Sequence, residues 1–104
     1  MKITGLIRLE DIVQKLAQKH AVKQEEIKEV FSNRPRFLFV EKGHRAGENV
    51  YSALGRTDSG RYLIIFFIGK KDGRALILST RDMTNSERRR YGKKQEFHFK
   101  GANL

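Results

Sequence analysis

The sequence contains no cysteine, no tryptophan and a single proline, and it has no long apolar run. Without cysteine, the protein has neither disulfide bonds nor thiolate chemistry. A membrane-spanning helix requires about 20 consecutive apolar residues, and no stretch of this chain approaches that length. No basic leader followed by an apolar segment is present either, so secretion is not expected. These absences predict a soluble protein of the cytoplasm.

The motifs of several enzyme classes are missing as well. There is no P-loop, no Gly-x-Gly-x-x-Gly pattern and no Gly-x-Ser-x-Gly elbow, which excludes nucleotide hydrolysis and the commonest serine hydrolase pattern. The three histidines do not recur with acidic residues at the spacing of a zinc site, so no metal and no other cofactor is expected. Metal-free acid–base chemistry stays open, since cleaving RNA requires only proton-transfer groups and cations that hold the phosphate.

Positive charge is what the chain has in excess. Its 104 residues carry 22 Lys and Arg against 12 Asp and Glu, a net charge of +10. Residues 1–31 hold six basic and five acidic groups, so the rest of the chain carries nearly all of the excess. A polyanion such as nucleic acid is the expected partner of this later part of the chain. The length allows one domain, expected over residues 1–94, with 95–104 as a tail or an extra strand.

Two early segments have the apolar period of an α-helix. In the second, Ile27, Val30 and Phe31 share one face, and Pro35 prevents the helix from continuing. Two short helices in succession predict a helical hairpin. Before them, residues 3–7 form a short apolar run interrupted by glycine, which fits an extended segment or an edge strand. The apolar positions of the first helix are Leu9, Ile12, Val13, Leu16 and Ala17.

After Pro35 the apolar period becomes that of strands. The four strands expected are 36–41, 50–56, 62–68 and 75–80. The last three are separated by Asp58-Ser59-Gly60 and Lys71-Asp72-Gly73, short turns that join antiparallel neighbours. The strand at 62–68 has no polar alternation, so we expect it to be central and covered on both faces.

A final helix is predicted by Thr84-Asn85-Ser86-Glu87, a capping box whose Thr and Glu each satisfy an orphan backbone N–H group. The helix is basic and is expected to stop at Gly92. The fold class expected from these elements is α+β. An N-terminal helical hairpin packs on a four-stranded antiparallel meander, and a short basic helix follows at the C-terminus.

Two positions in this predicted fold carry residues suited to acid–base catalysis or phosphate binding. His44 and Glu48 lie in the expected loop at 43–47 and at its border, where an imidazole could act as acid or base or could simply be exposed. Arg81 ends the last strand just before the capping box, so its guanidinium could bind a phosphate beside helix N-terminal amides. A salt bridge from Arg81 to Asp82 or Glu87 is the alternative.

The order of several short motifs resembles the BrnT family. The motifs that carry the resemblance are Lys19-His20-Ala21-Val22, Glu25-Glu26, Val30-Phe31, His44 with Glu48 and Tyr51, Gly55-Arg56-Thr57, Gly60-Arg61, Leu78-Ser79-Thr80-Arg81, Met83-Thr84, Glu87-Arg88 and Tyr91. The resemblance implies a RelE-like fold and a type II toxin that arrests translation by cutting RNA. It also implies a ribbon-helix-helix antitoxin as partner, and leaves open an oligomer with that antitoxin.

The resemblance further implies the roles of individual residues. Lys19 and Glu26 would be helix-borne site members, with His44 and Glu48 as the acid–base pair. Arg74 and Arg81 would bind the phosphate. Apart from the resemblance, the excess of positive charge in the later part of the chain leads us to expect RNA contacts from Arg56, Arg61, Arg88, Arg89, Lys93 and Lys94. The chain departs from the family at Ala21, where glycine is usual, and at Val50 and Leu76, where arginine is usual. A non-catalytic nucleic-acid-binding module and a protein whose main surface binds an antitoxin-type partner are the two alternatives.

Overall fold

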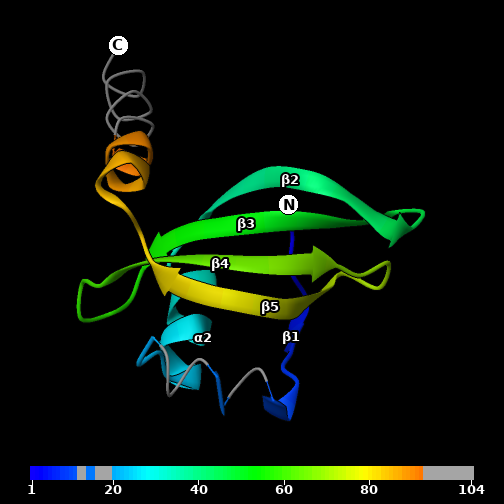
Figure 1. Ribbon diagram of the computed structural model, residues 1–104, viewed down its shortest axis with the longest axis horizontal. Coiled ribbons are helices and arrows are strands. Elements are labelled where there is room, and N and C mark those ends of the chain that lie inside the picture. Colours follow the sequence, from blue (N-terminus) through cyan, green and yellow to red (C-terminus); the bar gives the residue numbers. More distant parts are fainter. Residues whose placement is uncertain (12–13, 16–19, 93–104) are drawn as a thin grey trace.

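One sheet organises the structure, a computed structural model that describes residues 1–11, 14–15 and 20–92. Within those residues the sheet has five strands in the order β1-β5-β4-β3-β2 (Figure 1). Strands β2 to β5 form the antiparallel meander that the sequence predicts. The α+β class is therefore confirmed. The elements are β1 (Gly5–Ile7), α2 (Gln24–Ser32), β2 (Arg36–Arg45), β3 (Glu48–Arg56), β4 (Tyr62–Gly69) and β5 (Arg74–Asp82).

The predicted number of four strands is wrong, because β1 adds a fifth. It lies parallel to β5, from Gly5 opposite Arg74 to Ile7 opposite Leu76. The short apolar run at 3–7 is thus an edge strand, one of the two options that the sequence offers. Three residues that include a glycine carry almost no periodic signal, so this strand exists through its pairing with a distant segment.

The second predicted helix is confirmed as α2. Its first turn is closed by Glu26, whose carboxylate accepts a hydrogen bond of 3.0 Å from the backbone N–H of Lys23. Ile27 and Val30 are buried against the sheet. The first predicted helix and its hairpin packing fall largely on residues 12–13 and 16–19, outside the described residues, although 10–11 and 14–15 are helical.

The expected loop at 43–47 is wrong, since the two flanking strands continue through most of it. Strand β2 extends to Arg45 and β3 begins at Glu48, which leaves a two-residue turn that includes Gly47 at a φ of +79°. A side chain at Gly43 would overlap the backbone carbonyl of Glu48, so only glycine permits this close approach. Register shifts in the pairing bend this part of β2.

Strand β4 is central and covered on both faces, as predicted. On one face, Leu63, Ile65 and Phe67 pack with α2 in the larger core cluster. On the other, Ile64 packs in a smaller cluster with Tyr91. That tyrosine belongs to a C-terminal helix whose residues 85–92 are described, so the predicted stop at Gly92 lies at the border of the described residues. No helix among the described residues is long and apolar enough to span a membrane.

The two ends of the sheet differ in what they carry. We call the end where β3 and β5 finish the arginine end, since Arg56 and Arg81 lie at the ends of these strands. The C-terminal helix follows β5 at this end (Figure 1). We call the opposite end, which holds the β2–β3 and β4–β5 turns, the turn end. The candidate site residues are distributed between these two ends.

Candidate functional site

The residues expected to form one site are separated by the length of the sheet. Arg74 and Arg81 occupy opposite ends of β5, seven residues and roughly 20 Å apart. Glu48 and Arg56 are separated in the same way along β3. The structure places Glu26, Arg56, Arg61, Arg81, Arg88 and Arg89 toward the arginine end, places His44, Glu48 and Arg74 at the turn end, and does not describe Lys19, Lys93 and Lys94.

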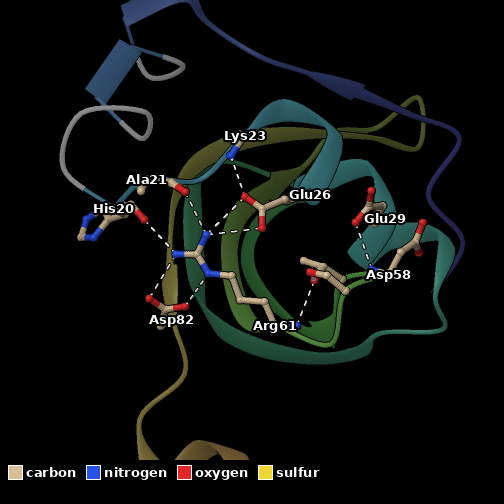
Figure 2. Close-up of polar contacts among 10 residues, drawn as sticks. His20, Ala21, Lys23, Glu26, Glu29, Asp58, Arg61 and Asp82 are labelled. Atoms are coloured by element: carbon tan, nitrogen blue, oxygen red, sulfur yellow. Dashed lines mark hydrogen bonds and ion pairs between the residues drawn. The ribbon is translucent and has the colours of Figure 1, made fainter.

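Arg61 is the centre of a network at the arginine end (Figure 2). Its Nε and Nη2 donate to the two carboxylate oxygens of Asp82 at 2.7 and 3.1 Å, and its Nη1 donates to Glu26 at 3.2 Å. The backbone carbonyls of Ala21 and His20 accept from Nη1 and Nη2 at 2.9 and 2.8 Å. All N–H donors of this guanidinium therefore have protein acceptors, and Arg61 ties the 20–21 segment, α2 and β5 together.

Electrostatics strengthens this network. The hydrogen bonds from Arg61 hold the pKa of Asp82 below its usual value, and the charge of His20 contributes in the same direction. Asp82 in turn raises the pKa of Arg61, with Glu26 adding to the effect. Glu26, which the resemblance makes a site member, thus contributes to the arginine end as an acceptor for Arg61.

Arg81 is held by Glu87, so the salt bridge named as the alternative is present. Nη1 and Nη2 of Arg81 donate to the two carboxylate oxygens of Glu87 at 2.7 and 3.0 Å, a bidentate pair. The predicted capping box is confirmed around the same carboxylate, which accepts from the N–H of Thr84 at 2.9 Å. The guanidinium also lies over the ring of Phe66, 5.6 Å from its centroid. The two donors Nη1 and Nη2 form what we call the fork of Arg81. A carboxylate therefore occupies the fork that a phosphate would use.

The ion pair between Arg81 and Glu87 makes the stability of the fold depend on pH. The hydrogen bonds from Arg81 lower the pKa of Glu87 from 4.5 to about 2. Because the folded-state pKa is the lower one, the stabilisation is complete above the unfolded-state value and is lost as the pH falls through the folded-state value. We expect the free energy of unfolding to fall by about 2 kcal/mol more in the unmodified protein than in Glu87→Gln between pH 5 and pH 2. Urea unfolding at both pH values measures this difference, and equal losses would contradict it.

Five arginines at the arginine end form what we call the arginine patch, namely Arg36, Arg56, Arg88, Arg89 and Arg90. None of them forms an ion pair with a carboxylate that the structure describes. The guanidinium carbons of Arg56 and Arg88 lie 4.9 and 4.3 Å from the centroid of the Tyr62 ring. Nη1 of Arg36 donates to the carbonyl of Arg90 at 3.2 Å, which joins β2 to the C-terminal helix. The patch therefore presents cations whose charge no described neighbour neutralises.

At the turn end, the carboxylate of Glu48 is already engaged. It accepts a hydrogen bond of 2.9 Å from Nζ of Lys70 and one of 3.4 Å from the backbone of Lys71, and the bond from Lys70 lowers its pKa. His44 is exposed on β2, and no hydrogen bond joins it to Glu48 in the described residues. Arg74 is paired with Asp72 at 2.8 Å. The expected acid–base pair is therefore not formed by direct contact.

Val50 and Leu76, the two positions where the BrnT family usually has arginine, lie close together in the sheet. Val50 is paired with Ile68, and Ile68 is paired in turn with Leu76. This row is apolar, so no cation comes from it. Arg74 shares the face of Leu76, two residues away on β5, but its guanidinium is bound to Asp72.

Sequence reasoning did not assign His20 to a site, although the residue is part of the Lys19-His20-Ala21-Val22 motif. The signal that places it at the arginine end is a contact between distant segments, from Arg61 to its backbone carbonyl. Among the described residues, no group of three or more His, Asp or Glu side chains could hold a metal ion.

The chain matches the model of a known protein family. A family model described as the ribonuclease toxin BrnT of a type II toxin–antitoxin system matches residues 11–87, which is more than half of the chain. The match covers the Arg61 network, Arg81 and Glu87. No curated protein matches the sequence.

Proposed function

The chain belongs to the BrnT family of ribonuclease toxins of type II toxin–antitoxin systems, and we propose that it is a metal-independent endoribonuclease that inhibits translation by cutting RNA. Membership implies an antitoxin protein as partner. We further propose that this partner is of the ribbon-helix-helix type and that the toxin acts in the cytoplasm.

The observation that carries the proposal is the concentration of cations at the arginine end. Arg81 offers a bidentate fork, and the arginine patch lies beside it without described carboxylate partners. Forks of this kind match phosphate oxygens as well as carboxylate oxygens. An RNA strand at this end would therefore meet one arginine fork at the scissile phosphate and several cations along its backbone.

The reaction that such a site would catalyse is an intramolecular phosphoryl transfer within the RNA strand. The 2′-oxygen of RNA forms a bond to phosphorus, the bond from phosphorus to the 5′-oxygen breaks, and the products are a 2′,3′-cyclic phosphate and a 5′-hydroxyl. A base must take the 2′-hydroxyl proton and an acid must supply one to the leaving oxygen. Arginine contributes by stabilising the extra negative charge that the phosphate carries in the transition state.

Glu87 is the internal competitor of the phosphate for Arg81. Its carboxylate fills the fork in the free protein and keeps the guanidinium oriented. Since more than a third of the Arg81 side chain is exposed, a phosphate can approach the same guanidinium from solvent. We propose that RNA replaces or shares this contact on binding.

The test is incubation of the purified protein with a labelled single-stranded RNA in EDTA. We expect cleavage with cyclic phosphate and 5′-hydroxyl ends, since no step of the proposed transfer requires a metal ion. Intact RNA that binds with a steep salt dependence would instead support a nucleic-acid-binding module, because each phosphate contact contributes a slope of about 0.7 in the logarithmic salt plot for a single strand. Intact RNA without binding would support a protein that acts through its antitoxin-type partner.

His44, Glu48 and Arg74 are the second candidate group for the same reaction. Glu48 contacts Lys70 and Lys71, and Arg74 begins β5 shortly after them, so the turn end also offers cations. The arginine end is favoured because Arg56, Arg88, Arg89 and Arg90 of the arginine patch are exposed there, whereas Arg74 and Lys70 are paired with Asp72 and Glu48.

A further inference from the structure

A pocket of about 670 Å³ lies on the face of the sheet that α2 covers. Its lining comes from the N-terminal segment (residues 1–6), which leads into β1, from the C-terminal half of α2 and from the start of β2 (Figure 1). Ligand sites in proteins usually have volumes of about 300–1,000 Å³. None of the lining residues is a candidate for the ribonuclease site, so the pocket has no role in the reaction proposed above.

The interior of the pocket is apolar. Ile3 and Leu6 of the N-terminal segment line it together with Phe31 of α2 and Phe37 of β2, and all four are half-buried against the larger core cluster. The rings of Phe31 and Phe37 both meet Phe67 edge-on, with centroids 5.6 and 5.9 Å away. A side chain that enters the pocket would therefore cover apolar surface held in place by the core, which favours binding.

The apolar surface continues along β2 beyond the pocket. Phe39 shares the face of Phe37, since strand residues two apart point to the same side, and its ring lies 6.0 Å from that of Tyr51. Phe39 is 58% exposed, and every other aromatic side chain that the structure describes is half-buried or buried. Within the described residues β2 is also an edge strand. An exposed ring beside a free strand edge is typical of a surface that binds another polypeptide.

The rim of the pocket is basic. Lys2, Lys28 and Arg34 line it and are exposed, and no acidic residue does so. In the part of the chain that the structure describes, none of these three cations forms an ion pair with a carboxylate. Positive charge around an apolar interior is complementary to a segment that combines apolar and acidic side chains.

The pocket and the fork of Arg81 lie on opposite faces of the sheet. Arg81 lies over the ring of Phe66, which packs with Ile64 in the smaller cluster on the side of the C-terminal helix. Phe31 and Phe37 pack in the larger cluster on the side of α2. An RNA strand held at the fork would leave the pocket uncovered, so a ligand of the pocket and the RNA need not compete for the same contacts.

We propose that this pocket, together with Phe39, is the docking site for an apolar and acidic segment of the antitoxin protein. One apolar side chain of the segment fills the pocket, neighbouring carboxylates pair with Lys28 and Arg34, and the segment continues along β2 to Phe39. A second copy of this chain fits less well, because its net charge of +10 would meet a rim of the same sign. The inference rests on the antitoxin partner of the proposed function and not on the ribonuclease chemistry.

The first test measures the binding of a labelled peptide in which Leu and Phe alternate with Glu. We expect the variant that combines Lys28→Glu with Arg34→Glu to bind it roughly tenfold more weakly or worse, and Phe39→Ser about tenfold more weakly. Arg45→Glu makes an equal change of charge per residue at the far end of β2 and should stay within about twofold. A peptide with Ser in place of Leu and Phe should bind poorly to all of them.

Several results would overturn the inference. It is wrong if the unmodified protein does not bind the alternating peptide, if the Ser-containing peptide binds equally well, or if Arg45→Glu weakens binding as much as the double variant. A labelled single-stranded RNA should bind the double variant nearly as well as it binds the unmodified protein. If RNA binding falls as far as peptide binding, the pocket belongs to the RNA surface instead.

The second test uses the antitoxin itself, carrying an affinity tag and produced together with the chain. The unmodified protein and Arg45→Glu should be retained by the tagged antitoxin, whereas Phe39→Ser and the double variant should be largely lost. Equal retention of all variants would place the antitoxin elsewhere and overturn the inference. Absence of RNA cleavage by the unmodified protein, with these losses still observed, would overturn the proposed ribonuclease activity and leave the docking site standing.

Discussion

Arg81→Ala is expected to lower the rate of RNA cleavage at least a hundredfold while the protein stays folded. Removal of one preorganised donor that stabilises developing charge costs other enzymes about 100- to 1000-fold in rate. Arg81 supplies two such donors from one planar group, as its bidentate contact with Glu87 shows. The measurement is the single-turnover cleavage rate in EDTA, with thermal unfolding recorded for each variant.

Two matched variants separate the contribution of the bidentate contact of Arg81 from the contribution of its positive charge. Arg81→Lys keeps the charge but cannot make a bidentate contact, so we expect it to recover only a small part of the rate. Arg45→Ala removes an exposed arginine from the end of β2, far from Arg81, and should leave the rate within about twofold. If Arg45→Ala reduced cleavage as much as Arg81→Ala, general charge would explain the effect and the assignment of Arg81 would be wrong.

The loss of Arg81 also leaves Glu87 without its partner. A carboxylate that loses a bidentate partner destabilises the fold by about 1–2 kcal/mol. The double variant Arg81→Ala with Glu87→Ala removes both charges and should regain most of that stability. It should not regain activity. Recovered activity in the double variant would show that the single variant was inactive because it was unstable.

Much of the fold could be predicted because the information was local. Strands β2 to β5 follow from an apolar period that changes after Pro35, and the turns between β3, β4 and β5 follow from Asp and Gly in short separators. The capping box at Thr84 is a four-residue pattern, and the structure contains both of its hydrogen bonds. Each of these features depends on residues within one element or one turn.

What could not be predicted depends on pairing between distant segments. Strand β1 forms only because β5 is beside it, and the β2–β3 hairpin continues past Gly43 because two backbones approach closely there. The same limit applies to the candidate site. Nothing in the spacing of His44 and Arg81 indicates that an antiparallel sheet puts them at opposite ends, whereas the register of β2 to β5 makes this unavoidable.

Arg61 is the clearest case of a residue whose role changes once the contacts are visible. From the sequence, Arg61 was expected to be one of the RNA-contacting cations. In the structure its five donors face Asp82, Glu26 and two backbone carbonyls. We therefore propose that Arg61 positions the site, while Arg56 and Arg88 of the arginine patch meet the RNA.

Arg61→Ala should consequently be the most destabilising single change in this network, by about 3 kcal/mol. It leaves the Glu26 and Asp82 carboxylates near each other without their shared cation, and it leaves two backbone carbonyls without a donor. For a domain of this size, 3 kcal/mol corresponds to a fall in the melting temperature of roughly 12–20 °C. Arg74→Ala is the matched control, because its pair with Asp72 is about half exposed on both sides and should contribute less than about 1 kcal/mol.

Arg61→Ala and substitutions in the arginine patch should affect RNA cleavage and RNA binding differently. Because Arg61 binds Asp82, the residue next to Arg81 on β5, its loss should reduce cleavage even at temperatures where the variant is fully folded. RNA binding should fall much less, since the donors of Arg61 do not face solvent. Arg88→Ala should show the opposite balance, with weaker RNA binding, a smaller salt slope and little loss of stability. If Arg61→Ala instead weakened binding as Arg88→Ala does and left stability unchanged, Arg61 would be an RNA contact and the network would not be the framework of the site.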